Sequence, residues 1–198
     1  MLGKLRAKYE QAMQPIGRSL GRLGVTPNTI TTVSLILALL AGFAYAMKMP
    51  LLGALGLVSS GIVDMLDGAM ARATGKITRF GAVYDPVADR YAEFFVLVGI
   101  ALGGFVEWFW VVFALFGMVM ASYTRARAES SGGLKSCAVG IAERQEKIIL
   151  LLVGSILQPF IGVALFFSVV IVGVLSHITV VQRLQFTWKQ TSGEAIHV

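Results

Sequence analysis

Long apolar runs separated by short links constrain this chain more than any other feature of its sequence. Each run approaches the ~20 residues that an α-helix needs to cross the hydrocarbon core of a bilayer. Because the hydrocarbon core offers no hydrogen-bond partners to backbone N–H and C=O groups, runs of this length are expected to be helical. We therefore predict an all-α, polytopic integral membrane protein with six transmembrane helices. Their approximate ranges are 29–47, 51–70, 81–103, 105–123, 148–159 and 160–181.

Composition supports a membrane protein rather than a soluble domain. Of the 198 residues, 56% are hydrophobic and 14% are charged, and the mean hydropathy is +0.76. The hydrophobic share is higher and the charged share is lower than in ordinary soluble domains. A single cysteine, Cys137, excludes an internal disulfide framework.

The two ends of the chain differ from the apolar middle. Residues 1–24 alternate basic and apolar side chains at helical spacing, which predicts an amphipathic helix lying in the membrane interface. This basic, amphipathic pattern is not that of a cleavable signal peptide. We expect one membrane domain over 1–198, in which 27–183 form the six-helix bundle and 184–198 form a polar tail.

The basic residues predict an orientation in the membrane. All 17 Lys and Arg residues except Lys48 lie in the N-terminal segment, in 72–90, in 125–147 or after 181. With six spans these regions share one side, which the positive-inside rule makes cytoplasmic. We therefore expect a multi-pass protein of the cell membrane with both termini and the active site in the cytoplasm. The net charge of +6 then reflects acidic lipids and phosphate substrates rather than nucleic acid.

All four aspartates of the chain lie in one stretch, 64–89. Asp64 and Asp67 are three residues apart, and Asp85 and Asp89 are four apart, so each pair shares one helix face. Two helices that each present a pair of carboxylates can converge on one spot.

Such a cluster predicts a metal site. Four carboxylates repel one another unless a cation neutralises them, and charges near a bilayer are costly. Oxygen ligands without His or Cys favour a hard cation, Mg²⁺ or Mn²⁺, with two ions expected. Paired ions suit phosphoryl transfer. The competing interpretation is a set of helix-end ion pairs with Arg72, Arg79 and Arg90.

The spacing of this stretch resembles the signature of the CDP-alcohol phosphotransferases. The matching positions are Asp64, Asp67, Gly68, Ala71, Arg72, Gly81, Asp85 and Asp89. The similarity covers nearly the whole chain, because it extends to 26–28, 122–129, 143–147 and 181–184. The segment 26–28 resembles the N-terminal entry of the family, and the other three are similar to the branch that makes phosphatidylinositol phosphate or its archaeal ether-lipid counterpart.

The resemblance implies roles for particular residues. The four aspartates are expected to hold two divalent cations, and Asp89 also acts as the base that deprotonates the acceptor hydroxyl. The residues expected to contact the CDP-linked lipid, which is CDP-diacylglycerol or CDP-archaeol, are Asn28, Thr29, Gly68, Arg72 and Thr78. The resemblance also implies a homodimer.

A second basic constellation is expected to bind the acceptor. Arg125, Lys147 and Arg183 match family positions that bind the phosphate of inositol phosphate. Arg125 stands where the family pattern has Lys, and Lys147 where it has Arg, and these side chains do not present the same geometry to a phosphate. Three nearby acids are expected to orient these cations or to cap helices: Glu129, Glu143 and Glu146.

The predicted function is therefore transfer of a phosphatidyl or archaetidyl group to myo-inositol 1-phosphate, with release of CMP. Glycerol 3-phosphate is the alternative acceptor within the same chemistry. An intramembrane prenyltransferase would also use aspartates and Mg²⁺ but would release pyrophosphate. A cation transporter would place its acids near the middle of the bilayer rather than at one rim.

Overall fold

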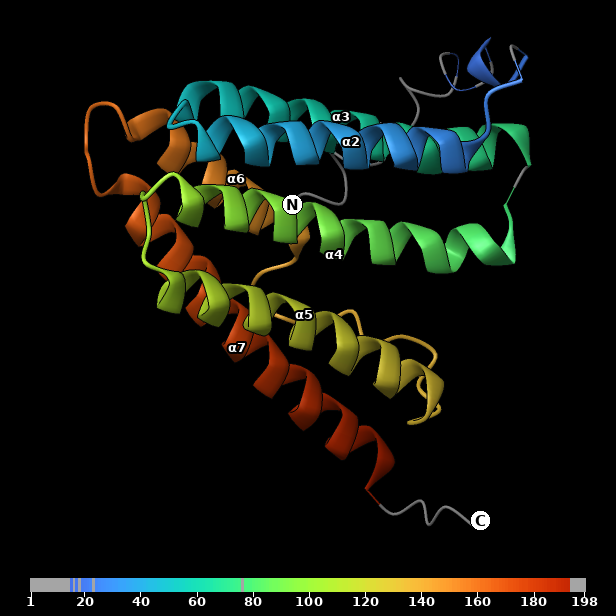
Figure 1. Ribbon diagram of the computed structural model, residues 1–198. Coiled ribbons are helices and arrows are strands. Elements are labelled where there is room, and N and C mark those ends of the chain that lie inside the picture. The colour runs from blue at the N-terminus through green and yellow to red at the C-terminus, as the bar shows by residue number, and fades with distance from the viewer. Residues whose placement is uncertain (1–14, 16, 18, 23, 76, 193–198) are drawn as a thin grey trace. The chain divides into compact units, whose positions relative to one another are not determined.

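The computed structural model describes residues 15, 17, 19–22, 24–75 and 77–192 (Figure 1). Within these residues the regular structure is helical throughout, which confirms the predicted all-α class. The helices are α2 (Pro27–Ala46), α3 (Pro50–Thr74), α4 (Arg79–Leu102), α5 (Trp108–Ser130), α6 (Arg144–Leu157) and α7 (Ala164–Thr191). By compactness the chain divides into two units, Met1–Gly99 and Ile100–Val198.

Local chemistry explains where the first helices begin and end. The Thr26 hydroxyl accepts a hydrogen bond from the Thr29 amide at 3.2 Å, and Pro27 follows at the first helical position. The α2–α3 turn contains Lys48 at a φ of 61°, after which Pro50 starts α3. Gly75, with a φ of 67°, ends α3 in the left-handed conformation that glycine adopts without strain.

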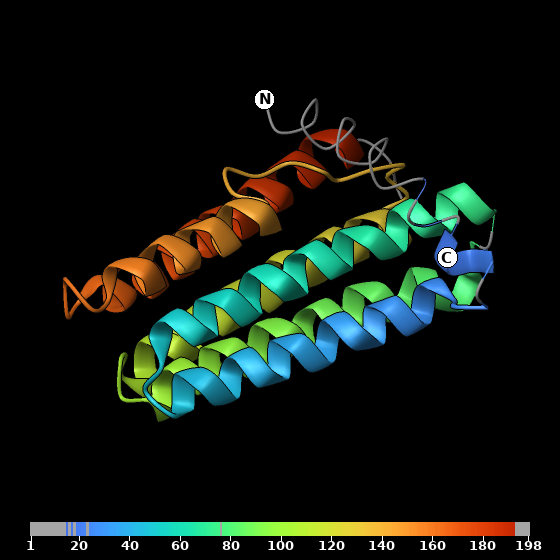
Figure 2. The same ribbon diagram turned by 90° about the horizontal axis from the view of Figure 1, so that it is seen from above.

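In the first unit, α2 and α3 pack side by side (Figures 1 and 2). Small polar residues join them at close range. The Ser34 hydroxyl donates to the Ser60 carbonyl at 3.0 Å, and the Ser60 hydroxyl donates to the Ser34 carbonyl at 2.9 Å. On the α4 side, a Cβ atom at Gly42 would overlap the Phe95 carbonyl. Close helix packing through small residues is typical of membrane bundles.

In the second unit, α7 packs against both α5 and α6. The turn from α6 to α7 is closed by Gln158, whose side chain donates to the Gly162 carbonyl at 2.6 Å and accepts from the Leu165 amide at 2.8 Å. At the start of α6, Glu143 and Glu146 form a capping box. This confirms the expectation that acids in this region cap a helix.

Four of the six predicted membrane spans are supported by the described helices. By length and composition, α2, α3, α5 and α7 can each cross a membrane. Helix α4 contains several acids and arginines and is therefore less apolar than these four helices. Helix α6 has 14 residues, a length of only ~21 Å. Six spans therefore stays a prediction.

The described residues cover only part of the two chain ends. The expected interfacial helix over 1–24 lies largely outside the described residues, as do 193–198. Helix α7 continues to Thr191, so the stretch 184–191, which was assigned to a polar tail, belongs to a helix. Its polar residues, Gln185, Lys189 and Gln190 among them, end the apolar run but not the helix, because Gln and Lys are good helix formers.

We predict that Gly42→Ala destabilises the protein by about 1–3 kcal/mol, because the added methyl group overpacks the backbone of α4. The measurement is thermal unfolding of the purified protein in detergent. Gly61→Ala is the matched control, since a Cβ atom there meets nothing within 4 Å. Equal unfolding temperatures for Gly42→Ala and wild type would show that this close approach is not required.

Candidate active site

Three aspartates meet in the first unit. Helix α3 carries Asp64 and Asp67, α4 carries Asp85, and one carboxylate oxygen from each lies within 4.8 Å of the others. Asp67 is buried, and the other two are half-buried. Asp89 lies one turn further along α4, and its Oδ2 is 3.8 Å from Nη2 of Arg90. The described residues thus bring three of the four predicted acids into one group.

This group fits a divalent cation. Three carboxylates at this separation carry like charges that repel, and a positive ion between them removes that cost. The donor set is oxygen only, which matches hard cations such as Mg²⁺ and Mn²⁺.

Thr31 contributes to the aspartate group, a role that the sequence analysis missed. Its hydroxyl donates to Oδ2 of Asp67 at 2.5 Å and is buried with it. This bond fixes the rotamer of Asp67 from the neighbouring helix α2. Its sequence signal was the spacing of Thr31 and Ser34, which puts two hydroxyls on the small-residue face of α2.

Two residues predicted to contact the CDP-linked lipid converge over Gly81. A Cβ atom at Gly81 would lie 3.0 Å from Oδ1 of Asn28 and 3.0 Å from Oγ1 of Thr78. Thr78 also accepts a hydrogen bond from the Gly81 amide at 2.9 Å. The start of α2 and the start of α4 therefore meet where only a glycine leaves space. Thr29, one residue further, lies exposed beside the Thr26 cap.

Gly68 and Arg72 also lie together, one turn apart on α3. A Cβ atom at Gly68 would be 3.3 Å from Nη1 of Arg72, so the guanidinium folds back over the glycine. The same helix carries Asp67 directly before Gly68 and Asp64 about one turn before it. A planar cation with several donors next to an acidic group is suited to a diphosphate bound by a metal ion.

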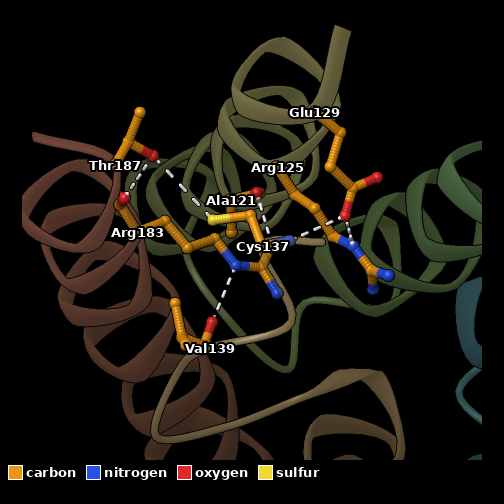
Figure 3. Close-up of polar contacts among 7 residues, drawn as sticks. All are labelled: Ala121, Arg125, Glu129, Cys137, Val139, Arg183 and Thr187. Atoms are coloured by element: carbon orange, nitrogen blue, oxygen red, sulfur yellow. Dashed lines mark hydrogen bonds and ion pairs between the residues drawn. The ribbon is translucent and has the colours of Figure 1, made fainter. Parts of the chain in front are cut away.

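In the second unit, Arg125 of α5 and Arg183 of α7 lie near each other (Figure 3). Nε of Arg125 donates to Oε1 of Glu129 at 2.9 Å, which confirms that Glu129 contacts one of these cations. Arg183 is 7% exposed. Its Nε donates to the Val139 carbonyl at 2.9 Å and its Nη1 to the Ala121 carbonyl at 2.5 Å. Arg183 therefore cross-links backbone segments, a function that the sequence analysis did not foresee.

Lys147 lies buried in the first turn of α6, directly after the Glu143–Glu146 capping box. A buried ammonium group needs anionic or polar partners, because desolvation is costly. The expected convergence of Lys147 with both arginines on one anion stays a prediction.

With this geometry in view, the comparisons with known proteins identify the family. The model of the CDP-alcohol phosphatidyltransferase family matches residues 24–182. The chain belongs to this family of membrane enzymes. An archaetidylinositol phosphate synthase from Pyrococcus horikoshii is 40% identical over 184 residues, which cover 93% of this chain and 95% of that protein.

Solved structures agree with this assignment. The crystal structure of Mycobacterium tuberculosis phosphatidylinositol phosphate synthase with CDP-DAG bound has a TM-score of 0.84 at 32% identity, and the match covers 95% of this chain and 100% of that one. The same enzyme in complex with manganese and citrate has a TM-score of 0.78 at 33% identity, over 89% of this chain and 88% of that one. Together with the three converging carboxylates, these matches establish a divalent-metal enzyme of the membrane.

We predict that Thr31→Val weakens divalent-metal binding by about tenfold, because side chains that hold a metal ligand in place contribute this much to affinity. The measurement is titration of the purified protein with Mn²⁺, followed by electron paramagnetic resonance. Thr74→Val on α3 is the control, since the Thr74 hydroxyl bonds to the Met70 carbonyl of its own helix. Equal Mn²⁺ affinities for Thr31→Val and wild type would mean that the Thr31 bond does not order Asp67.

Proposed function

We propose that this protein transfers a phosphatidyl or archaetidyl group from a CDP-linked lipid to myo-inositol 1-phosphate. The observation that carries this proposal is the group formed by Asp64, Asp67 and Asp85. Gly68 and Arg72 of the same helix are proposed to contact the nucleotide diphosphate. The relatives named archaetidylinositol phosphate synthase and phosphatidylinositol phosphate synthase support the choice of acceptor.

The proposed cofactor is Mg²⁺, as two ions held by Asp64, Asp67, Asp85 and Asp89, with Mn²⁺ as a substitute. When bound, such ions neutralise a diphosphate and make a coordinated hydroxyl more acidic. The oxygen-only donor set and the manganese complex of the M. tuberculosis enzyme support this assignment.

The chain's own residues divide the remaining work. Asn28, Thr29, Gly68, Arg72 and Thr78 bind and orient the CDP-linked lipid. Asp89 accepts the proton of the acceptor hydroxyl, whose oxygen attacks the lipid-side phosphorus. The bond between that phosphorus and the bridging oxygen of the diphosphate breaks, and CMP leaves with the electron pair.

The acceptor phosphate is proposed to bind to Arg125, Lys147 and Arg183. Guanidinium groups suit a phosphate because they offer parallel N–H donors. The bonds to Glu129, Val139 and Ala121 use the Nε groups of both arginines and one Nη1 donor of Arg183. An arginine has five N–H donors, so terminal donors are left for an anion.

We further propose that the chain is a single membrane domain with six spans and an interfacial helix before them. Both termini and the active site then face the cytoplasm, and the protein assembles as a homodimer. The distribution of Lys and Arg supports this orientation.

We expect the purified protein, given Mg²⁺ and CDP-diacylglycerol or CDP-archaeol, to convert labelled myo-inositol 1-phosphate to a lipid product with release of CMP. Glycerol 3-phosphate is the competing acceptor in a parallel reaction. Product only with glycerol 3-phosphate would contradict the proposed acceptor but keep the chemistry. Release of pyrophosphate in place of CMP would contradict both.

We predict that Asp85→Asn lowers kcat at least about 10³-fold, because it removes one negative charge from the group that binds the metal ions. Treatment of the wild type with a chelator should have a similar effect, reversed by added Mg²⁺. Glu107→Gln is the control for loss of one acid, since Glu107 caps no backbone group at the start of α5. Full activity of Asp85→Asn, or of the chelated enzyme, would exclude this metal site.

A further inference from the structure

The segment 131–143, which connects α5 to α6, has no regular secondary structure but is packed in place. Cys137 within it is 0% exposed. The Ile141 amide donates to Oε1 of Gln182 at 2.8 Å, and Arg183 donates to the Val139 carbonyl. At Gly140, a Cβ atom would lie 2.5 Å from Cγ2 of Thr179. The connecting segment is therefore fixed along α7 by several bonds and one close backbone approach.

Glu129 of α5 also bonds to the connecting segment. Its Oε1 accepts from the Cys137 amide at 2.9 Å and from Nε of Arg125 at 2.9 Å (Figure 3). One carboxylate oxygen thus joins the connecting segment to a cation proposed to bind the acceptor. The guanidinium donates to Glu129 through Nε, so the terminal nitrogens of Arg125 retain N–H donors for a phosphate.

Charge gives Glu129 a second effect. Arg125 and Arg183 repel each other, and Glu129 attracts both. The side chain of Arg125 is 46% exposed. Without Glu129 it can therefore rotate into water, away from Arg183. An isolated exposed pair four residues apart contributes little. This pair differs because the same oxygen also accepts from the amide of the buried residue Cys137.

We propose that Glu129 is a positioning residue of the acceptor site. It orients Arg125 toward the phosphate and couples this orientation to the packing of the connecting segment. The inference rests on the proposed function, because it assigns Arg125 to the acceptor.

The test combines steady-state kinetics with the reactivity of Cys137, which is the single cysteine of the chain. Purified full-length Glu129→Ala is expected to raise the KM for myo-inositol 1-phosphate about tenfold, as loss of one charge-assisted hydrogen bond would. The KM for the CDP-linked lipid should change less than about twofold. Cys137 should react with a maleimide about tenfold faster than in the wild type, because the segment opens more often.

Glu129→Gln separates the two effects. Its amide oxygen can still accept from the Cys137 amide, so Cys137 should stay as unreactive as in the wild type. The lost charge should still raise the KM for the acceptor. Glu107→Ala and Glu107→Gln, at the opposite end of α5, are the matched controls and should change neither quantity.

Two results would overturn the inference. If Glu129→Ala keeps the wild-type acceptor KM, the pair with Arg125 is only a surface ion pair. If the variant raises the KM values of both substrates equally, Glu129 has a general structural role. A wild type that forms no product from myo-inositol 1-phosphate would instead refute the proposed function, and the inference with it.

Discussion

Mutual repulsion among carboxylates on two neighbouring helices is the constraint on which the first unit depends. Asp64, Asp67 and Asp85 lie within 4.8 Å of one another in an otherwise apolar chain, and a cation is the group that makes this arrangement favourable. The packing of α2 through α4 serves the same end. Close contacts through serine and glycine bring the backbones together, and the hydroxyl of Thr31 fixes one of the acids.

In the second unit the like charges that repel each other are positive. Two arginines of like charge lie near each other, and their Nε groups are bonded by a carboxylate and a carbonyl. Arg183 donates two hydrogen bonds to backbone carbonyls, so it holds the segment between α5 and α6 in place. It also contributes a positive charge to the proposed acceptor site. The fold of this segment and the proposed binding of the acceptor phosphate thus depend on the same side chain.

The sequence allowed the helices and the acidic group to be predicted because both follow from local spacing. Hydropathy located all the described helices, but it ended the last one near residue 181, whereas α7 reaches Thr191. The bond from Thr31 to Asp67 and the bonds around segment 131–143 could not be predicted, because they join residues far apart in the sequence. For the same reason Arg183 was given a role in phosphate binding alone, and its bonds to Ala121 and Val139 went unseen.

The central claim is that these aspartates bind paired cations on a nucleotide diphosphate. Anomalous diffraction from crystals grown with Mn²⁺ and a CDP-linked lipid tests it most directly. The account predicts two manganese peaks bounded by Asp64, Asp67, Asp85 and Asp89, with the diphosphate against Arg72. An ordered nucleotide elsewhere, or carboxylates turned apart with no peak between them, would contradict it.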